Sequence, residues 1–223
     1  MLTRFSKSSA FNFLKCSSAG SLEREAIMGR YFHSLGLGAQ VLSYVSGERD
    51  WLLTSRVSGD DATTACYLAQ PERLAELSGK LLRRLHGMDG KNCPIQNRME
   101  SYFALAEQNY RAGQFDLSYG DFKSADEAWQ VLCEGKHLLK NDTLLHGDYC
   151  LPNFMLEDWE FTGFIDVGNG GIGDRHVDIF WGIWTLEFNL GTNAYRDVFI
   201  DAYGRDRVDE NILRVISAAE VFG

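Results

Sequence analysis

The stretch HGDYCLPNF, residues 146–154, places His146, Asp148 and Asn153 close together around a proline. The three residues have the spacing H-x-D-x-x-x-x-N, and the asparagine leads directly into the apolar residues FML. Aspartate and asparagine in turns usually hydrogen-bond their own backbone. The stretch alone therefore fits a polar turn as well as a catalytic loop, and the flanking sequence has to decide between the two.

A second acidic motif follows shortly after this stretch. FMLED at 154–158 and FTGFIDV at 161–167 flank a short turn and predict a β-hairpin that ends at Asp166. Such a hairpin brings Asp148, Asn153 and Asp166 to one edge of a small sheet. Oxygen ligands of this kind bind Mg²⁺ and leave one aspartate free to orient a hydroxyl nucleophile. Phosphoryl transfer needs mainly such positioning and charge neutralisation.

The rest of the chain has a strand-rich beginning and a helical remainder. RFS and FNFLKC flank the polar turn SKSSA, and two further strands flank SGERD. Between them, Ser21 is expected to cap a helix that ends at the glycines 36 and 38. From Gln70 onward apolar residues recur at helical spacing, which predicts helices that include 98–111, 125–138, 174–190, 192–203 and 209–221. Ser124 with Glu127 is a capping-box signal.

Composition narrows the class of protein. The chain has 223 residues, of which 45% are hydrophobic and 24% charged, as in ordinary globular proteins. Its five scattered cysteines predict neither a disulfide framework nor a zinc site. No apolar run could span a bilayer and no secretory signal is recognisable, so a cytoplasmic protein is expected. A net charge of −9 argues against nucleic acid or anionic membrane as the main partner and is compatible with a cationic ligand.

At this point the sequence resembles a known family. LLHGDYCLPNFML followed by GFIDVGNGGIGDRHVDI is similar to the antibiotic kinases, specifically the aminoglycoside 3'-phosphotransferases, from about Phe11 to the C-terminus. The resemblance implies an α+β, bilobal, protein-kinase-like fold. A small sheet-plus-helix nucleotide lobe would span 1–58, and a mostly helical lobe with the catalytic and substrate sites would span 59–223. It also implies an enzyme that uses ATP and Mg²⁺ to phosphorylate a hydroxyl, the 3'-hydroxyl above all, of a cationic aminoglycoside.

The family's catalytic roles can be carried over to matching positions. By resemblance, Asp148 is the catalytic base and also touches the substrate, while Asn153 and Asp166 hold the metal. His146 and Asp178 are expected to be structural, with Asp178 fixing the catalytic loop.

The nucleotide side of the site is expected in the first lobe. Kinases place a strand lysine on the phosphates and hold it with a helix glutamate. FNFLKC supplies Lys15, and the family's L-E-R-E motif in SLEREAIM indicates Glu25 as its partner. Phe13 points to the same side of the strand as Lys15 and resembles the adenine-stacking aromatic. LLTSRVSGD resembles the hinge, whose backbone from Ser55 to Val57 would hold the adenine edge.

The substrate side rests on fewer signals. AAEVFG matches the family's chain end, which makes Glu220 the expected substrate carboxylate. Asp116 and Asp121 fall in the stretch that corresponds to the family's acidic substrate loop, and Asn169 stands where relatives carry a basic residue. For these three positions an ordinary exposed polar residue is the more common alternative.

The chain departs from the family at its N-terminus, and two alternative functions stay open. Only 14 residues precede Lys15, so the nucleotide lobe is expected to lack the family's first strand and phosphate-covering loop. A kinase with another small hydroxylated or cationic acceptor, as in choline or sugar kinases, would keep the same chemistry. A degenerate kinase fold that binds a nucleotide or partner without turnover is the alternative from another class.

Overall fold

The computed structural model describes the backbone of residues 2–7 and 10–223 and the side chains from residue 12 onward. Its contacts divide the chain into two compact units. Unit 1 comprises Met1–Leu74 and His146–Gly170, and unit 2 comprises Ala75–Leu145 and Gly171–Gly223. The division differs from the expected boundary at residue 58, because the segment that begins at His146 packs with the N-terminal part of the chain.

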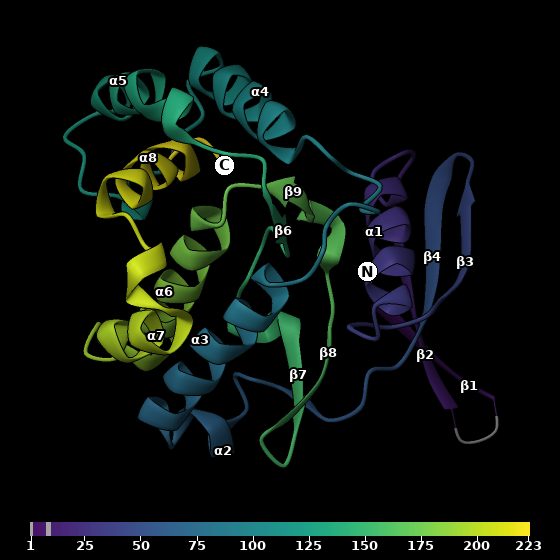
Figure 1. Cartoon of the computed structure of the whole chain (residues 1–223). Coiled ribbons are helices and arrows are strands. Elements are labelled where there is room, and N and C mark those ends of the chain that lie inside the picture. Colours follow the sequence, from purple (N-terminus) through teal and green to yellow (C-terminus); the bar gives the residue numbers. More distant parts are fainter. Residues whose placement is uncertain (1, 8–9) are drawn as a thin grey trace. The chain divides into compact units, whose positions relative to one another are not determined.

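Unit 1 contains a four-stranded antiparallel sheet with the order β1-β2-β4-β3. Its strands are β1 (Leu2–Lys7), β2 (Ala10–Ser18), β3 (Val41–Ser46) and β4 (Arg49–Ser55), which confirms both predicted hairpins. Helix α1 (Glu23–Ser34) runs beside β3 and β4 (Figure 1) and packs Leu22 and Ala26 against Leu52. The helix ends as predicted, because Gly36 adopts a left-handed backbone with φ +71°.

The prediction that Ser21 caps α1 is wrong. Leu22 occupies the N-cap position, and the hydroxyl of Ser21 donates to the carbonyl of Ser18 instead. The acceptor at this helix end comes from β4, where Asp50 accepts a hydrogen bond from the amide of Leu22. Sequence patterns cannot reveal a cap that a distant strand supplies.

The second sheet of unit 1 contains the predicted hairpin. Strands β7 (Phe154–Glu157) and β8 (Glu160–Phe164) pair antiparallel, and β5 (Asp60–Asp61) joins β7. The amide of Phe164 donates to the carbonyl of Leu37 at 2.7 Å, and the rings of Phe32, His146 and Phe164 pack edge to face. These contacts join the hairpin to the end of α1. Short helical segments complete the unit: α2 (Ala65–Leu68), η3 (Leu151–Asn153) and η4 (Val167–Asn169).

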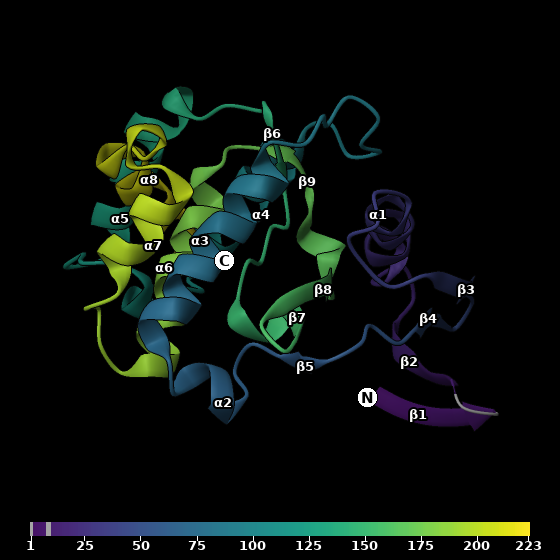
Figure 2. The ribbon, with the colours of Figure 1, turned by 60° about the horizontal axis from the view of Figure 1, so that its bottom comes forward.

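Unit 2 is mostly helical, as predicted. Helix α3 (Pro71–His86) leads into it, and α8 (Glu210–Glu220) packs against α5 and α6 (Figures 1 and 2). Ser124 caps α5 as predicted, because it accepts a hydrogen bond from the amide of Glu127. The remaining elements are α4 (Arg98–Arg111), η1 (Leu117–Tyr119), α5 (Ala125–Gly135), η2 (Lys136–Leu138), β6 (Thr143–Leu145), β9 (Gly171–Gly173), α6 (His176–Leu190), α7 (Arg196–Tyr203) and η5 (Arg205–Arg207).

Two predictions from composition concern the cysteines and membrane-spanning segments. The five cysteines are free thiols, of which Cys93 and Cys150 are buried. Among the described residues, every helix is too short or too polar to cross a bilayer.

Candidate active site

A cavity of about 360 Å³ lies within unit 1 between the four-stranded sheet, α1 and the β7–β8 hairpin. Its walls are mainly apolar and include Val41, Leu52 and Phe164. Of the seven residues expected to contact the nucleotide or its metal, Asn153 does not line the cavity, whereas the other six do: Phe13, Lys15, Glu25, Ser55, Val57 and Asp166. The structure therefore brings together Lys15 and Asp166, which are 151 positions apart in the sequence.

Lys15 is the centre of the polar part of this cavity. Its ammonium nitrogen lies 2.6 Å from Oε1 of Glu25 and also donates to Oδ1 of Asp166. Lys15 is placed by β2, Glu25 by the first turn of α1, and Asp166 by the end of the hairpin. The neighbouring Glu23 is exposed.

The backbone around Asp166 is unusual. Asp166 is left-handed, with φ 57° and ψ 43°, and begins the short helix η4. This loop approaches α1 closely, because a Cβ added at Gly168 would lie 3.2 Å from Cβ of Glu25. The side chain of Arg24 donates to the carbonyls of Gly168 and Gly170 and holds the loop on the same helix turn.

The HGDYCLPN stretch forms the second part of the site. The Nδ2 group of Asn153 donates to the backbone oxygen of Asp148 at 3.0 Å and to its Oδ2 at 2.8 Å. His146 is buried, and its Nε2 lies 3.0 Å from the carbonyl of Ile165. The amide of Asp148 donates to Nδ1 of His146, so Nε2 carries the imidazole hydrogen. His146 thus links the HGDYCLPN stretch to the residue before Asp166.

Gly147 permits this arrangement. It has φ +84°, and an added Cβ would lie 2.0 Å from the carbonyl oxygen of Asn169. Residues with side chains are strained in this conformation and would also collide with the loop after Asp166.

The donor set suits a magnesium ion bound together with phosphates. Asn153 and Asp166 lie at neighbouring ends of the hairpin, because the amide of Ile165 donates to the carbonyl of Asn153 at 2.9 Å. The described residues contain no group of three or more His, Cys, Asp or Glu side chains that could hold a metal by themselves. Mg²⁺ does not require such a group, since it usually takes one or two protein oxygens and completes its shell with water and substrate phosphates.

Apart from Asp148, the expected substrate residues lie in unit 2 in different environments. Glu220 is buried, and its Oε1 accepts hydrogen bonds from Tyr102 at 2.7 Å and Trp181 at 3.0 Å. Burial, reinforced by this carboxylate, raises the pKa of Tyr102 well above 10. Asp116 is exposed and caps η1 through the amide of Ser118, whose hydrogen bonds lower the pKa of Asp116.

Asp121 lines a second cavity, of about 680 Å³, formed by η1, α6, α7 and α8. Trp184 and Phe188 form part of its wall, with stacked rings whose centroids are 4.9 Å apart. Asn169 and Asp178, which the sequence also singled out, lie away from this cavity lining. Asn169 is exposed in η4, and Asp178 is fully buried in unit 2, where its Oδ2 lies 3.1 Å from Nε2 of His86.

Sequence reasoning missed Asp50, which touches the start of α1. Alternation along β4 could have indicated it, because Asp50 shares a face of the strand with buried Leu52. A carboxylate on the buried face of a strand calls for hydrogen-bond donors.

Comparisons with known proteins define the class of this fold. The structure superposes on the crystal structure of an aminoglycoside-3'-phosphotransferase of type VIII with a TM-score of 0.81 and 25% identity, covering 100% of this chain and 88% of that one. The fold is therefore the protein-kinase-like fold of the aminoglycoside phosphotransferases, as predicted.

The family follows from the sequence matches. The model of the phosphotransferase enzyme family matches residues 12–211, and the chain belongs to this family. It is 44% identical to a probable aminoglycoside 3'-phosphotransferase of Lactococcus lactis over 95% of this chain and 82% of the relative. An aminoglycoside 3'-phosphotransferase of Niallia circulans is 31% identical over 75% of this chain, which spans 65% of that relative's length.

Proposed function

We propose that this chain transfers the γ-phosphate of ATP to a hydroxyl of an aminoglycoside, with the 3'-hydroxyl as the expected acceptor and Mg²⁺ as the metal. The convergence of Lys15, Glu25 and Asp166 in the cavity of unit 1 carries this proposal. Membership in the phosphotransferase enzyme family and the names of its relatives support it.

The apolar part of the cavity suits an adenine ring. Phe13, Val41 and Leu52 provide surfaces on which a flat heterocycle can be buried. The amide of Ser55 already donates to the carbonyl of Gln40, and its hydroxyl accepts from the amide of Gln40. We therefore expect Ser55 to form the wall and the backbone of Arg56 and Val57 to face the adenine edge.

The polar part of the cavity suits the phosphates. Glu25 fixes the ammonium group of Lys15, which then neutralises phosphate charge without having to reorganise. Asn153 and Asp166 would hold Mg²⁺, which supplies further neutralisation of the phosphates when it is bound.

Asp148 is suited to act on the acceptor hydroxyl. Asn153 occupies Oδ2 of Asp148, which orients the carboxylate and leaves Oδ1 for the hydroxyl proton. Asp148 accepts this proton while the hydroxyl oxygen forms a bond to the γ-phosphorus. The bond between that phosphorus and the bridging oxygen of ADP breaks, and ADP leaves with the electron pair.

The acceptor is expected to be cationic. The net charge of −9 and the exposed carboxylates of Asp116 and Asp121 favour amines over anions. The second cavity, with Asp121 in its lining, is the candidate acceptor surface of unit 2.

A coupled ADP-release assay with ATP and Mg²⁺ tests the proposal. We expect a rate that depends on kanamycin or neomycin and falls about 10²- to 10⁴-fold in Asp148→Ala, with ADP affinity unchanged. Phosphorus NMR of the product identifies the modified hydroxyl. Nucleotide binding without turnover on any acceptor would contradict the proposal and favour the non-catalytic alternative.

The aromatic wall of the second cavity favours one further candidate. Trp184, Phe188 and Tyr119 line this cavity, and aromatic rings attract a quaternary ammonium group. A kinase that acts on a small cation such as choline would use the same catalytic residues. Turnover of choline but not of kanamycin in the same assay would select this candidate.

A further inference from the structure

The first turn of α1 depends on a side chain from another element. The first amides of an α-helix have no partner within the helix, and a side-chain cap usually supplies one. At α1 neither Leu22 nor Ser21 does so. The amide of Leu22 instead donates to Oδ2 of Asp50 at 2.9 Å.

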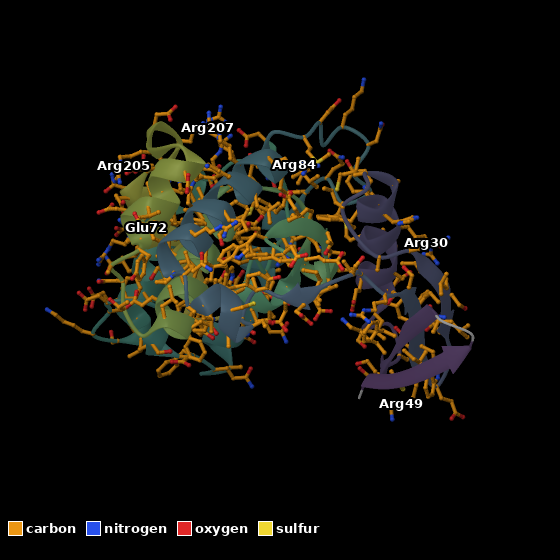
Figure 3. The ribbon with its side chains drawn as sticks, turned by 90° about the horizontal axis from the view of Figure 1, so that it is seen from below. Arg30, Arg49, Glu72, Arg84, Arg205 and Arg207 are labelled. Atoms are coloured by element: carbon orange, nitrogen blue, oxygen red, sulfur yellow. The ribbon has the colours of Figure 1, made fainter. Side chains whose placement is uncertain are left out.

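Asp50 is buried, and several hydrogen bonds fix its carboxylate. Its side chain is 0% exposed, whereas the preceding residue, Arg49, lies at the periphery of unit 1 (Figure 3). Tyr44 donates to Oδ2 of Asp50 at 2.9 Å, and Ser46 donates to Oδ1 at 2.7 Å. Burial acts to raise the pKa of Asp50, but hydrogen bonds from Ser46, Gly20, Leu22 and Tyr44 outweigh it and lower this pKa to about 2. The group is therefore a carboxylate that joins β3, β4 and the start of α1.

The same helix turn carries the polar part of the nucleotide cavity. Glu25 lies three residues after Leu22 and holds Lys15 at 2.6 Å. The loop after Asp166 rests on this turn through Gly168, and Arg24 donates to that loop. A displacement of the helix start would therefore move Glu25 and the support of Asp166 together.

We propose that Asp50 is a positioning residue for phosphate binding: it fixes the start of α1 so that Glu25 holds Lys15 in the nucleotide cavity. The inference rests on the proposed function, because it assigns a task within the proposed nucleotide site. Asp50 itself does not line that cavity, and it acts through the helix.

A double-mutant cycle on nucleotide affinity tests this inference. Asp50→Asn keeps the size of the side chain but turns an N–H₂ group toward donors and removes the charge from the helix start. We expect ATP binding, measured by calorimetry, to weaken about tenfold. In the Glu25→Gln background the same substitution should have little further effect, because the group that it positions is already disabled. Additive effects would overturn the proposal.

Asp174→Asn is the matched control. Asp174 is also a buried carboxylate, 3% exposed, and accepts the amides of Lys140 and His176 in unit 2. Its substitution should lower the thermal midpoint as Asp50→Asn does. Any effect of Asp174→Asn on ATP affinity, however, should be the same in the wild-type and Glu25→Gln backgrounds. A coupling to Glu25 as large as that of Asp50 would show that general destabilisation explains the effect.

Milder variants and a readout without nucleotide complete the test. Tyr44→Phe and Ser46→Ala each remove one donor to Asp50, and each should weaken ATP binding less than Asp50→Asn does. If Asp50→Asn does not fold, these two variants carry the cycle with Glu25→Gln. Amide hydrogen exchange of residues 20–28 should speed up in all three variants. If the wild-type chain binds no nucleotide, the proposed function fails, whereas unchanged exchange in this segment would overturn the role of Asp50.

Discussion

At the scale of single residues, the site depends on close approaches between backbones. Gly147 lets the HGDYCLPN stretch lie against the carbonyl of Asn169, which belongs to the loop that follows Asp166. The segments that carry the expected base, Asp148, and the expected metal ligand, Asp166, are therefore held together by this backbone contact and by the hydrogen bond from His146 to the carbonyl of Ile165.

Replacement of Gly147 by alanine tests this contact. The new Cβ would lie 2.0 Å from the oxygen of Asn169 at a left-handed backbone, so both collision and strain oppose it. We expect a loss of more than about 1 kcal/mol in the free energy of unfolding, measured with urea, and a lower kcat.

Gly113→Ala separates the two causes. Gly113 has φ +67°, and a Cβ added there would meet no atom within 4 Å. This variant reports backbone strain alone. If it destabilises the protein as much as Gly147→Ala does, the collision with Asn169 contributes nothing.

At the scale of elements, buried polar side chains tie helices of unit 2 to one another. His86, at the end of α3, contacts Asp178 of α6 through Nε2 and the hydroxyl of Tyr203 of α7 through Nδ1, at 3.1 and 2.9 Å. Burial lowers the pKa of His86 below 6.5, although the carboxylate of Asp178 acts in the opposite direction.

This shift makes stability depend on pH. As the pH falls through 6.5, the unfolded chain takes up a proton on this imidazole while the folded protein resists it. The free energy of unfolding should therefore decrease below pH 6.5, with a contribution from His86 of at most about 1.4 kcal/mol per pH unit. Urea unfolding of wild type and His86→Gln between pH 7 and pH 5.5 measures this contribution. Identical slopes in the two proteins would show that His86 is not its source.

The elements whose signals are local in sequence could be predicted, whereas contacts between distant elements could not. Alternation and turn residues predicted the hairpins, and the Ser124 cap of α5 was visible because both partners are local. The motifs around Lys15, Glu25, Asp148 and Asp166 named residues that the structure brings into one unit. The cap of α1 was not predictable, because its acceptor is 28 residues away in sequence. The burial of Glu220 also stayed hidden, because Tyr102 and Trp181 reach it only through the packing of α4, α6 and α8.

At the scale of the whole molecule, the two cavities belong to different compact units. The lining of the first cavity comes entirely from unit 1 and that of the second entirely from unit 2. The two substrates of the proposed reaction should therefore stabilise different parts of the chain.

Hydrogen exchange with each substrate alone measures this separation. With ATP and Mg²⁺ we expect protection at residues 13–15, 52–57 and 164–167, because these segments line the first cavity. With kanamycin alone we expect protection at residues 118–122, 183–188 and 210–217, around the second cavity. Protection of the second set by ATP alone would contradict the assignment of the cavities.

The left-handed backbone of Asp166 also restricts how this position can vary during evolution. Asparagine, aspartate and glycine are the residues that adopt this conformation most readily. Glutamate would keep the charge but is disfavoured by the backbone, glycine removes every oxygen ligand, and asparagine keeps one oxygen but loses the charge. Few substitutions of Asp166 are therefore expected to be neutral. A lineage that abandons the proposed metal binding should show asparagine or glycine at this position before any other residue.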